Sequence, residues 1–385
     1  MITATTALDR APYADVDVGH NRVALLKDGY QTFPAMLQAA REARSTLCIE
    51  TYILRDDAVG NQLASVLIER AYAGVEVNLM YDGWGAQVSD AYVMRLKLAG
   101  VRVLCFAPVR LLSRVARVIG RLRRRNHRKA MIVDGRVAFT GGLNLSNDYA
   151  AVEDGGHGWR DTHVRIEGPA AVQLERMFLD TWRKHRGPRL DEARYRRRTP
   201  HDDDDRVRFI GNEFAADRKD IRVAYVKAFN AARRRIHVMN AYFMPPSRVL
   251  RSLMKAARRG VDVTLILAGT TDVPIVLLGS RGLYGKLLRS GVRIFEWKGR
   301  ILHAKTAVVD AHWSTIGSAN LDTLSLRQNL EVNAVIEDDT FGASMEKLFN
   351  TDLHSCVEVT RETLADRSLF ERLLSWLAYQ VRSWL

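Results

Sequence analysis

The sequence contains an internal duplication, and this feature restricts the possible folds more than any other. Residues 126–144, NHRKAMIVDGRVAFTGGLN, resemble residues 302–320, LHAKTAVVDAHWSTIGSAN. Residues 33–54 resemble residues 225–244 in the same way. Two shorter stretches also match, 71–83 with 256–269 and 98–106 with 289–297. Self-similarity that runs in the same order through both halves indicates two copies of one structural unit.

Each half alternates short β-branched runs with amphipathic segments that end in glycine. VEVNLMY and VDVTLILA are typical of strands, whereas ASVLIERAYAG and LRSLMKAARRG are typical of helices. Strands that alternate with helices favour a layered α/β architecture. We therefore expect an α/β protein with two tandem α/β/α sandwich domains related by pseudo-twofold symmetry.

The duplication also predicts the domain boundaries. We expect a lead-in at 1–19, a first domain at 20–186, a linker at 187–206, a second domain at 207–355 and a C-terminal amphipathic helical region at 356–385. The linker is polar, carries blocks of charge and has few large apolar residues, which predicts a flexible segment. Its Asp202–Asp205 run is expected to be solvated, because a flexible acidic run offers a metal ion no fixed geometry.

Both halves carry the pattern H-x-K-x4-D, with an asparagine ten residues after the aspartate. The first copy is His127, Lys129, Asp134 and Asn144, and the second is His303, Lys305, Asp310 and Asn320. Residues i and i+2 share one face of a strand, so each His–Lys pair points the same way. One such pattern is weak by itself. Two copies at equal spacing in a duplicated chain predict a catalytic site.

These residue types suit the transfer of a phosphodiester. Two lysines and two asparagines around one phosphate would stabilise the charge that grows on its oxygens. A neutral imidazole is a nucleophile at neutral pH, and a protonated imidazole can give a proton to the leaving oxygen. One histidine cannot fill both roles in one step. We therefore expect the two half-sites to form one active site that works through a covalent phosphohistidine, with no metal and no cofactor.

Four further residues are candidates for the site. Asp161 and Glu331 lie 34 and 28 residues after the histidines of their own halves, and each is expected to orient that histidine. Tyr52 and Tyr242 occupy matched places in the repeats and are expected to line the site, although an aromatic residue at a strand end is more often part of the core.

The duplicated motif resembles the phospholipase D superfamily. The surrounding sequence, over roughly residues 20–350, is similar to bacterial cardiolipin synthases of the minor B type, which lack N-terminal membrane anchors. The matching segments include HRKAMIVDGRVAFTGGLN, AYFMPPSRVL and HAKTAVVDAHWSTIGSANLDTLSLRQNLEVNAVIED. The sequence departs from the family at Gly142, where serine is commoner, and at Ala311, where glycine is usual.

The resemblance implies two phospholipase D-like domains and a metal-free, ping-pong phosphatidyl transfer. Two phosphatidylglycerols would be joined with release of glycerol, with His127 as nucleophile and His303 as acid and then base. The alternatives are a hydrolase of the same superfamily, either a phospholipase D or a nuclease, and a non-catalytic membrane scaffold. Intact motifs in both halves argue against the scaffold. The simple nucleases of the superfamily are single-motif chains, which argues against a nuclease.

The net charge of +14 favours an anionic partner. Val101 and His127 are 26 positions apart, whereas the matched Val292 and His303 are 11 apart. The extra stretch is rich in arginine, and a basic amphipathic segment there is expected to bind anionic membrane. The alternative is a solvated or nucleic-acid-binding loop. The arginines expected to contact substrate or membrane are Arg121, Arg123, Arg124 and Arg125.

The rest of the sequence bears on location. The N-terminus lacks the apolar core of a signal peptide, no run approaches a membrane span, and the three cysteines show no metal-binding pattern. The amphipathic helix expected at 369–385 would pack either on the core or on a membrane. We expect a peripheral protein on the cytoplasmic side of the bacterial cell membrane. Its partners would be anionic phospholipid and the membrane surface, with no nucleic acid and no obligatory protein partner.

Overall fold

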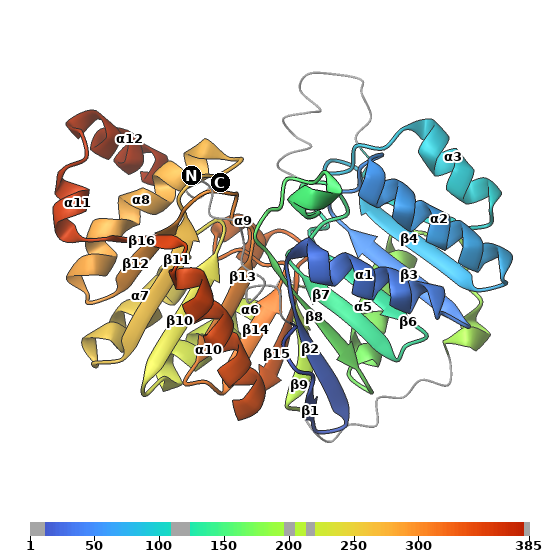
Figure 1. The fold of residues 1–385 in the computed structure, drawn as a ribbon, viewed down its shortest axis with the longest axis horizontal. Coiled ribbons are helices and arrows are strands. Elements are labelled where there is room, and N and C mark those ends of the chain that lie inside the picture. The colour runs from blue at the N-terminus through green and yellow to red at the C-terminus, as the bar shows by residue number, and fades with distance from the viewer. Residues whose placement is uncertain (1–11, 109–123, 196–204, 213–219, 381–385) are drawn as a thin grey trace.

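The computed structural model describes residues 12–108, 124–195, 205–212 and 220–380. The chain forms two α/β units side by side, each built on a mixed eight-stranded sheet with helices on its faces (Figure 1). The α/β fold with two tandem domains is therefore confirmed. Within the described ranges, no helix is long and apolar enough to cross a bilayer.

The first sheet has the order β1-β2-β8-β7-β6-β3-β4-β5. Its strands are β1 (Val16–Val18), β2 (Asn21–Lys27), β3 (Thr46–Thr51), β4 (Glu76–Asp82), β5 (Arg102–Phe106), β6 (Ala130–Val133), β7 (Val137–Gly141) and β8 (Thr162–Glu167). Helices α1 (Asp28–Arg41), α2 (Ala58–Tyr72), α3 (Asp90–Leu98) and α5 (Ala171–Lys184) belong to this unit, with 3₁₀ turns η2 (Val152–Asp154) and η3 (Glu192–Arg194).

The second sheet has the order β16-β12-β11-β10-β13-β14-β15-β9. Its strands are β9 (Val207–Gly211), β10 (Arg235–Asn240), β11 (Asp262–Ala268), β12 (Arg293–Trp297), β13 (Lys305–Val309), β14 (Trp313–Gly317), β15 (Val332–Glu337) and β16 (Cys356–Val359). Its helices are α6 (Asp220–Ala231), α7 (Ser247–Arg258), α8 (Pro274–Arg289), α9 (Thr323–Arg327), α10 (Asp339–Leu353), α11 (Arg361–Ala365) and α12 (Leu369–Gln380).

The two units repeat one pairing scheme around the motif strand. β3 pairs in parallel with β4 and antiparallel with β6, and β10 pairs in parallel with β11 and antiparallel with β13. Every residue of β3, β6 and β13 is buried, because helices cover both faces of the sheet. The predicted glycine ends are present after α2 and α7, where Gly74 and Gly260 have φ of 83° and 90°.

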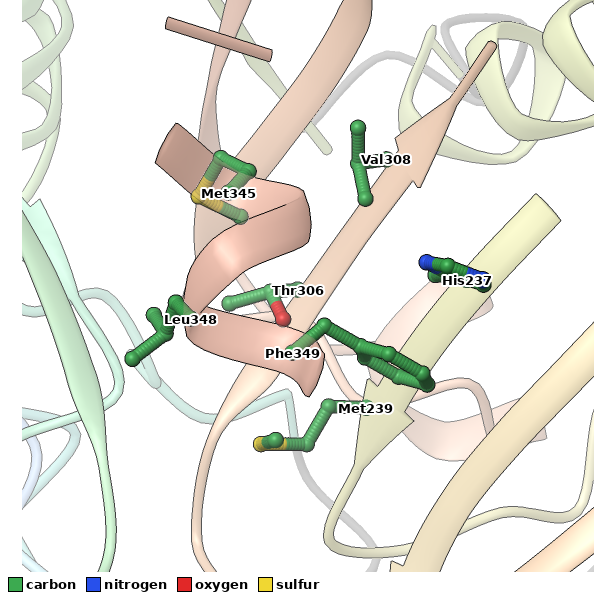
Figure 2. Close-up of a pocket in the computed structure, with 7 residues that line it drawn as sticks. All are labelled: His237, Met239, Thr306, Val308, Met345, Leu348 and Phe349. Carbon is green, nitrogen blue, oxygen red and sulfur yellow. The ribbon is translucent and has the colours of Figure 1, made fainter. Parts of the chain in front are cut away.

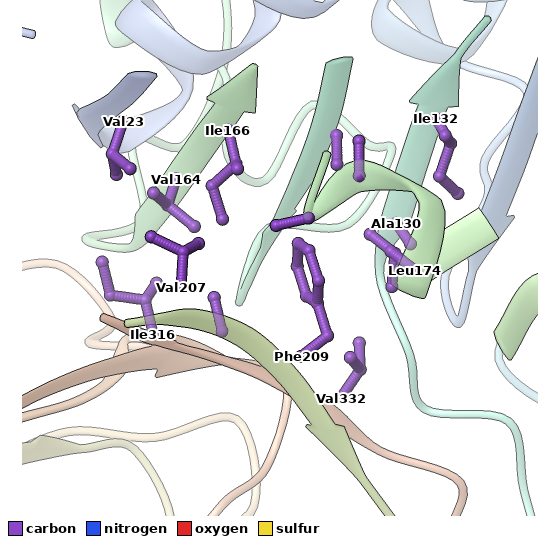
Figure 3. Packing of buried hydrophobic residues seen from close by; sticks show 14 of the residues in the cluster. Val23, Ala130, Ile132, Val164, Ile166, Leu174, Val207, Phe209, Ile316 and Val332 are labelled. Atoms are coloured by element: carbon purple, nitrogen blue, oxygen red, sulfur yellow. The ribbon is translucent and has the colours of Figure 1, made fainter. Parts of the chain in front are cut away.

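One hydrophobic core runs between the two sheets and fixes the units against each other. Figure 3 shows Ala130, Val164 and Leu174 of the first unit packed against Phe209 and Val332 of the second. Dense apolar packing of this kind leaves little room for relative movement. The geometry of a site formed between the units is therefore set by this core.

The motif aspartates belong to the scaffold. Asp134 lies in a turn with φ of 52° and accepts hydrogen bonds from the amides of Arg44, Ser45 and Thr46 at 2.7–2.9 Å. Asp310 accepts hydrogen bonds in the same way from the amides of residues 233–235, each at 2.8 Å. Both lie at the far end of their strands from the histidines. The prediction that they are catalytic is therefore wrong, and their function is to anchor the start of β3 and β10.

The expectation of a flexible linker at 187–206 is wrong for residues 187–195. Leu190 and Tyr195 are buried, and the Tyr195 hydroxyl donates to Glu76 Oε1 and accepts from Asn78 Nδ2, both at 2.9 Å. The Tyr195 hydroxyl therefore ties the segment to β4, and both buried side chains fix it against the first unit. Residues 196–204 lie outside the described residues.

The C-terminal region expected at 356–385 begins with a strand. β16 pairs antiparallel with β12 and completes the second sheet, so this part is not an independent helical region. α12 docks on α8 through the small residues Ser375 and Ala378, which are buried. A Cβ added at Gly282 of α8 would lie only 2.7 Å from the Ser375 carbonyl oxygen, so the glycine allows this close approach. Phe370, Leu373, Trp376 and Leu377 of α12 are exposed, whereas Tyr379 packs against the core of the second unit.

A small apolar cavity lies between the second sheet and α10 (Figure 2). The His237 ring stacks on Phe349 there, with centroids 4.3 Å apart, and burial lowers the pKa of His237 to about 4. A neutral, stacked imidazole among apolar side chains is a packing residue. The cavity is lined by His237, Met239, Thr306, Val308, Met345, Leu348 and Phe349.

Candidate active site

Each motif histidine lies in a short extended segment just before its strand and is hydrogen-bonded to the other unit. The His127 amide donates to the Leu330 carbonyl at 2.9 Å, and the His303 amide donates to the Arg160 carbonyl at 2.7 Å. Two isolated bridges, Asn126 with Leu330 and Leu302 with Arg160, repeat this relation. The two histidines are thus brought together by backbone pairing between the units.

The carboxylates that orient the imidazoles also come from the opposite unit. His127 Nδ1 lies 3.0 Å from Glu331 Oε1, and His303 Nδ1 lies 2.7 Å from Asp161 Oδ2. The predicted acids are the ones in contact, but the expectation that each serves the histidine of its own half is wrong. A carboxylate on Nδ1 favours the tautomer with the proton there, which leaves the Nε2 lone pair for chemistry.

The motif lysines supply buried positive charge. Lys129 Nζ donates to the His127 carbonyl at 2.7 Å, and Lys305 makes the same bond to the His303 carbonyl. Burial lowers the pKa of Lys129 to about 7 and that of Lys305 to about 8. Burial also lowers the pKa of both histidines, and the lysine of the opposite unit adds to this effect in each case. Charges from both units therefore act on one site.

These lysine pKa values predict how substrate binding depends on pH. Both ammonium groups must be charged to attract a phosphodiester, and the free enzyme loses them as the pH rises through about 7 and then about 8. We expect KM for an anionic phospholipid to rise over this range. kcat should change less, because a bound phosphate favours the ammonium forms. Steady-state kinetics from about pH 6 to pH 9 test this, and a KM that stays constant would contradict it.

The two motif asparagines are used differently. Asn144 Oδ1 accepts from the Ile53 amide at 3.0 Å, and its Nδ2 donates to the Tyr149 hydroxyl at 2.7 Å. Asn320 is also buried, but its Oδ1 has no hydrogen-bond partner among the described residues. The pseudo-twofold symmetry therefore does not extend to every polar contact of the site.

Comparison with known proteins agrees with the two repeated units. A family model described as "Cardiolipin synthase, PLD-like domain" matches the chain twice, at residues 36–182 and 225–353. The chain belongs to this family. It is 36% identical over 372 residues to Cardiolipin synthase B of Salmonella typhi, which covers 93% of the chain and 87% of that protein. It is also 36% identical to Cardiolipin synthase of Geobacillus thermodenitrificans, over 82% of the chain and 63% of that protein.

The crystal structure of phosphatidylserine synthase from Haemophilus influenzae shares the fold. Its TM-score is 0.72 with 12% identity, and the match covers 98% of both chains. At this identity the match shows the fold alone. The predicted family is confirmed, and the chain is an enzyme of the phospholipase D superfamily, a phosphatidyltransferase of the cardiolipin synthase kind.

Several residues that contact the catalytic groups of this synthase-like enzyme were not predicted from the sequence. The Tyr149 hydroxyl lies 3.3 Å from His303 Nδ1, and the rings of Tyr149 and Trp159 lie 5.4 Å and 5.9 Å from the His303 ring. Ser318 Oγ donates to Glu331 Oε2 at 2.5 Å. At the matched position, a Cβ on Gly142 would lie within 2.2 Å of the Asp161 carboxylate. The sequence did contain one signal of these contacts, because the two repeats differ at two matched places, with Gly142 against Ser318 and Asp161 against Glu331.

Tyr52 and Tyr242 both lie beside the histidine and lysine of their own unit. The Tyr52 ring is 4.8 Å from the His127 ring and 5.3 Å from Lys129 Nζ. The Tyr242 ring is 6.3 Å from the His303 ring and 5.9 Å from Lys305 Nζ. The strand register makes Glu50 equivalent to Met239. Tyr52 lies two residues after Glu50, whereas Tyr242 lies three residues after Met239. The two tyrosines are therefore one position apart in the repeat and not at matched places.

Two of the four predicted membrane-binding arginines are described, and they contact the protein. Arg125 is only 6% exposed, donates to the Ala107 carbonyl at 3.0 Å and lies 3.6 Å from Asp82. Arg124 donates to the Gln328 carbonyl at 2.6 Å. The membrane-binding prediction is therefore wrong for Arg125, whose charge is compensated inside the protein where the insertion rejoins the sheet. Arg121 and Arg123 lie outside the described residues.

Proposed function

We propose that this enzyme joins two phospholipids, most simply two phosphatidylglycerols with release of glycerol, through a covalent phosphatidyl-histidine. The observation that carries the proposal is the crossed arrangement at the site, where His127 contacts Glu331 and His303 contacts Asp161. Two imidazoles, each oriented by its own carboxylate beside two buried lysines, suit one nucleophile and one acid acting on the same phosphate.

In the first half-reaction, the Nε2 lone pair of His127 attacks phosphorus. The bond between phosphorus and the glycerol oxygen breaks, its electron pair goes to that oxygen, and His303 supplies the proton. Glu331 stabilises the positive charge that develops on the His127 ring. Burial and the lysines hold the pKa of His303 well below its ordinary value, and the negative charge of the bound phosphodiester favours its protonated form.

In the second half-reaction, a hydroxyl of another phosphatidylglycerol attacks the same phosphorus. Its proton passes to His303, which is now neutral, while the bond between phosphorus and Nε2 breaks and the electron pair returns to His127. Lys129 and Lys305 offset the charge on the phosphate oxygens in both steps, which is electrostatic stabilisation of the transition state. Both half-reactions thus use one set of groups.

Product analysis tests this proposal. Purified enzyme with phosphatidylglycerol vesicles is expected to yield a diphosphatidyl lipid and free glycerol, identified by mass spectrometry. EDTA should leave the rate unchanged, because lysines supply the positive charge in this mechanism. Phosphatidic acid as the sole lipid product would support the hydrolase alternative. Loss of the reaction in EDTA, restored by a divalent ion, would contradict the mechanism.

We further infer that the enzyme works on the cytoplasmic face of the cell membrane as a peripheral protein, without an obligatory protein partner or nucleic acid. α12 supports this placement. Its residues Phe370, Leu373, Trp376 and Leu377 are 68%, 52%, 56% and 47% exposed. A contiguous apolar face with a tryptophan is typical of helices that lie in the bilayer interface. α12 is held on α8 at Gly279, where an added Cβ would lie 3.6 Å from the Ala378 carbonyl oxygen.

Replacing Phe370 and Trp376 together with serine is expected to weaken binding to anionic vesicles roughly 10- to 100-fold, because two large apolar side chains leave the bilayer. Tyr72→Ser with Leu98→Ser is the matched control, since both residues are exposed on the first unit.

Reversing the charges of Arg121 and Arg123 should weaken binding to anionic vesicles at low salt, and less at high salt. Vesicle co-sedimentation measures all three. Unchanged binding of the α12 variant would remove this helix from the membrane-contacting surface.

A further inference from the structure

A carboxylate outside the duplicated motif lies beside His303. Asp272 is exposed in the loop between β11 and α8, and the Tyr242 hydroxyl donates to its Oδ1 at 2.6 Å. The Tyr242 ring lies 6.3 Å from the His303 ring and 5.9 Å from Lys305 Nζ. The tyrosine therefore holds the Asp272 carboxylate on the His303 side of the site.

This carboxylate has spare capacity to accept hydrogen bonds. Both of its side-chain donors, the hydroxyls of Tyr242 and Thr271, donate to Oδ1, at 2.6 Å and 3.3 Å. Within the part of the chain that the structure describes, Oδ2 accepts no hydrogen bond. An ionised carboxylate only accepts hydrogen bonds, and it repels phosphate. Its ligand in the site is therefore a hydrogen-bond donor without negative charge, and in a glycerol head group that donor is a hydroxyl.

The acid breaks the symmetry of the site. In the parallel strand pairs, Glu76 lies opposite Thr46 in the first unit and Asp262 lies opposite Arg235 in the second, so Glu76 and Asp262 are equivalent. Asp272 lies ten residues after Asp262 and therefore corresponds to Ala86, ten residues after Glu76. The loop on the His127 side instead carries Trp84, whose ring lies 5.6 Å from the Arg125 guanidinium. Of these two matched positions, only the one next to His303 carries a carboxylate.

We propose that Asp272, held by Tyr242, forms the alcohol subsite of the enzyme and binds the hydroxyl next to the reacting oxygen of a polyol head group. This inference rests on the function proposed above, in which His303 gives a proton to the leaving glycerol oxygen and later takes one from the attacking hydroxyl. Both oxygens must occupy the place beside His303. In each case the neighbouring carbon of the glycerol carries a hydroxyl, so one carboxylate can bind both the departing and the attacking alcohol.

The test uses a donor whose leaving group has no hydroxyl, the phosphatidyl ester of p-nitrophenol. Small alcohols then compete as acceptors, 1,2-propanediol against 1-propanol, and the ratio of their kcat/KM values is measured by mass spectrometry of the lipid products. Wild-type enzyme should prefer the vicinal diol. Asp272→Asn should reduce that preference roughly 10- to 100-fold, the size of a hydrogen bond to a charged group. Tyr242→Phe should give a smaller reduction, because the carboxylate remains but is no longer held.

Nitrophenol release separates the two proposals. Nitrophenol release is therefore followed in every variant, and the diol preference is read as a ratio of two acceptors on the same intermediate, which does not depend on how fast that intermediate forms. Asp180→Asn, which changes an exposed carboxylate on α5, is the matched control and should leave the diol preference unchanged. An unchanged preference in Asp272→Asn would overturn the alcohol subsite. Failure of wild-type enzyme to release nitrophenol would instead overturn the proposed transfer.

Discussion

Replacing either His127 or His303 with alanine is expected to reduce phosphatidyl transfer by about 10⁴-fold or more, because each change removes a group that acts directly on the phosphate. The two losses should differ in kind. Without His127 no covalent intermediate can form. Without His303 the nucleophile remains, so a donor with a good leaving group, such as nitrophenol, should still load it slowly.

A phosphatidyl adduct should therefore accumulate on His127 in the His303→Ala variant, where it can be located by mass spectrometry of proteolytic peptides. His312→Ala is the control, because His312 is exposed and pairs only with Asp339 on the surface. An adduct found on His303 alone, in the His127→Ala variant, would reverse the roles. Full activity of either variant would refute covalent histidine catalysis.

The second large effect is expected at the two crossed carboxylates. Glu331→Gln should slow transfer about 10³- to 10⁴-fold, because the imidazole of His127 loses the charge that holds its tautomer and stabilises its cation. Asp161→Asn should act on His303 in the same way. Ser318→Ala, which removes only a hydrogen bond to Glu331, should cost about tenfold.

Double variants distinguish crossed pairing from pairing within each half. In the His303→Ala background, adding Glu331→Gln should abolish the remaining adduct formation, whereas adding Asp161→Asn should change little because its partner is already absent. The rate of adduct formation with the nitrophenyl donor is the measurement. The opposite pattern would mean that each acid serves the histidine of its own half. Such non-additivity is expected only between residues that act together.

Much of the fold followed from local sequence patterns. The β-branched runs, the glycine-terminated amphipathic segments and the repeated order of both predicted two α/β units, and the structure has them. The fold prediction succeeded because strand and helix periodicity depends on residues only a few positions apart. The equal spacing of His127/Lys129 and His303/Lys305 also predicted two half-sites, and the structure places each pair at the start of its motif strand.

The spacing that the two motif copies share did not reveal which partner each polar residue contacts. Asp134 and Asp310 share the motif with the histidines, yet a strand separates them from the site and they bind backbone amides. Arg125 lies among arginines that were expected to contact substrate or membrane, but Asp82 and the Ala107 carbonyl compensate its charge. Tyr195 lies in a polar linker and is nevertheless buried against Asn78. In each case the partner is distant in sequence.

By itself the sequence determined two repeated units, the strands that carry the histidines and lysines, and the family to which the enzyme belongs. Only the tertiary structure decided that Glu331 orients His127, that Asp161 orients His303, and that Tyr242 holds Asp272 beside the second histidine. The reason is physical. Periodicity fixes the face of a strand on which a side chain lies, but the side chain it meets across the site depends on how the shared core packs two sheets together.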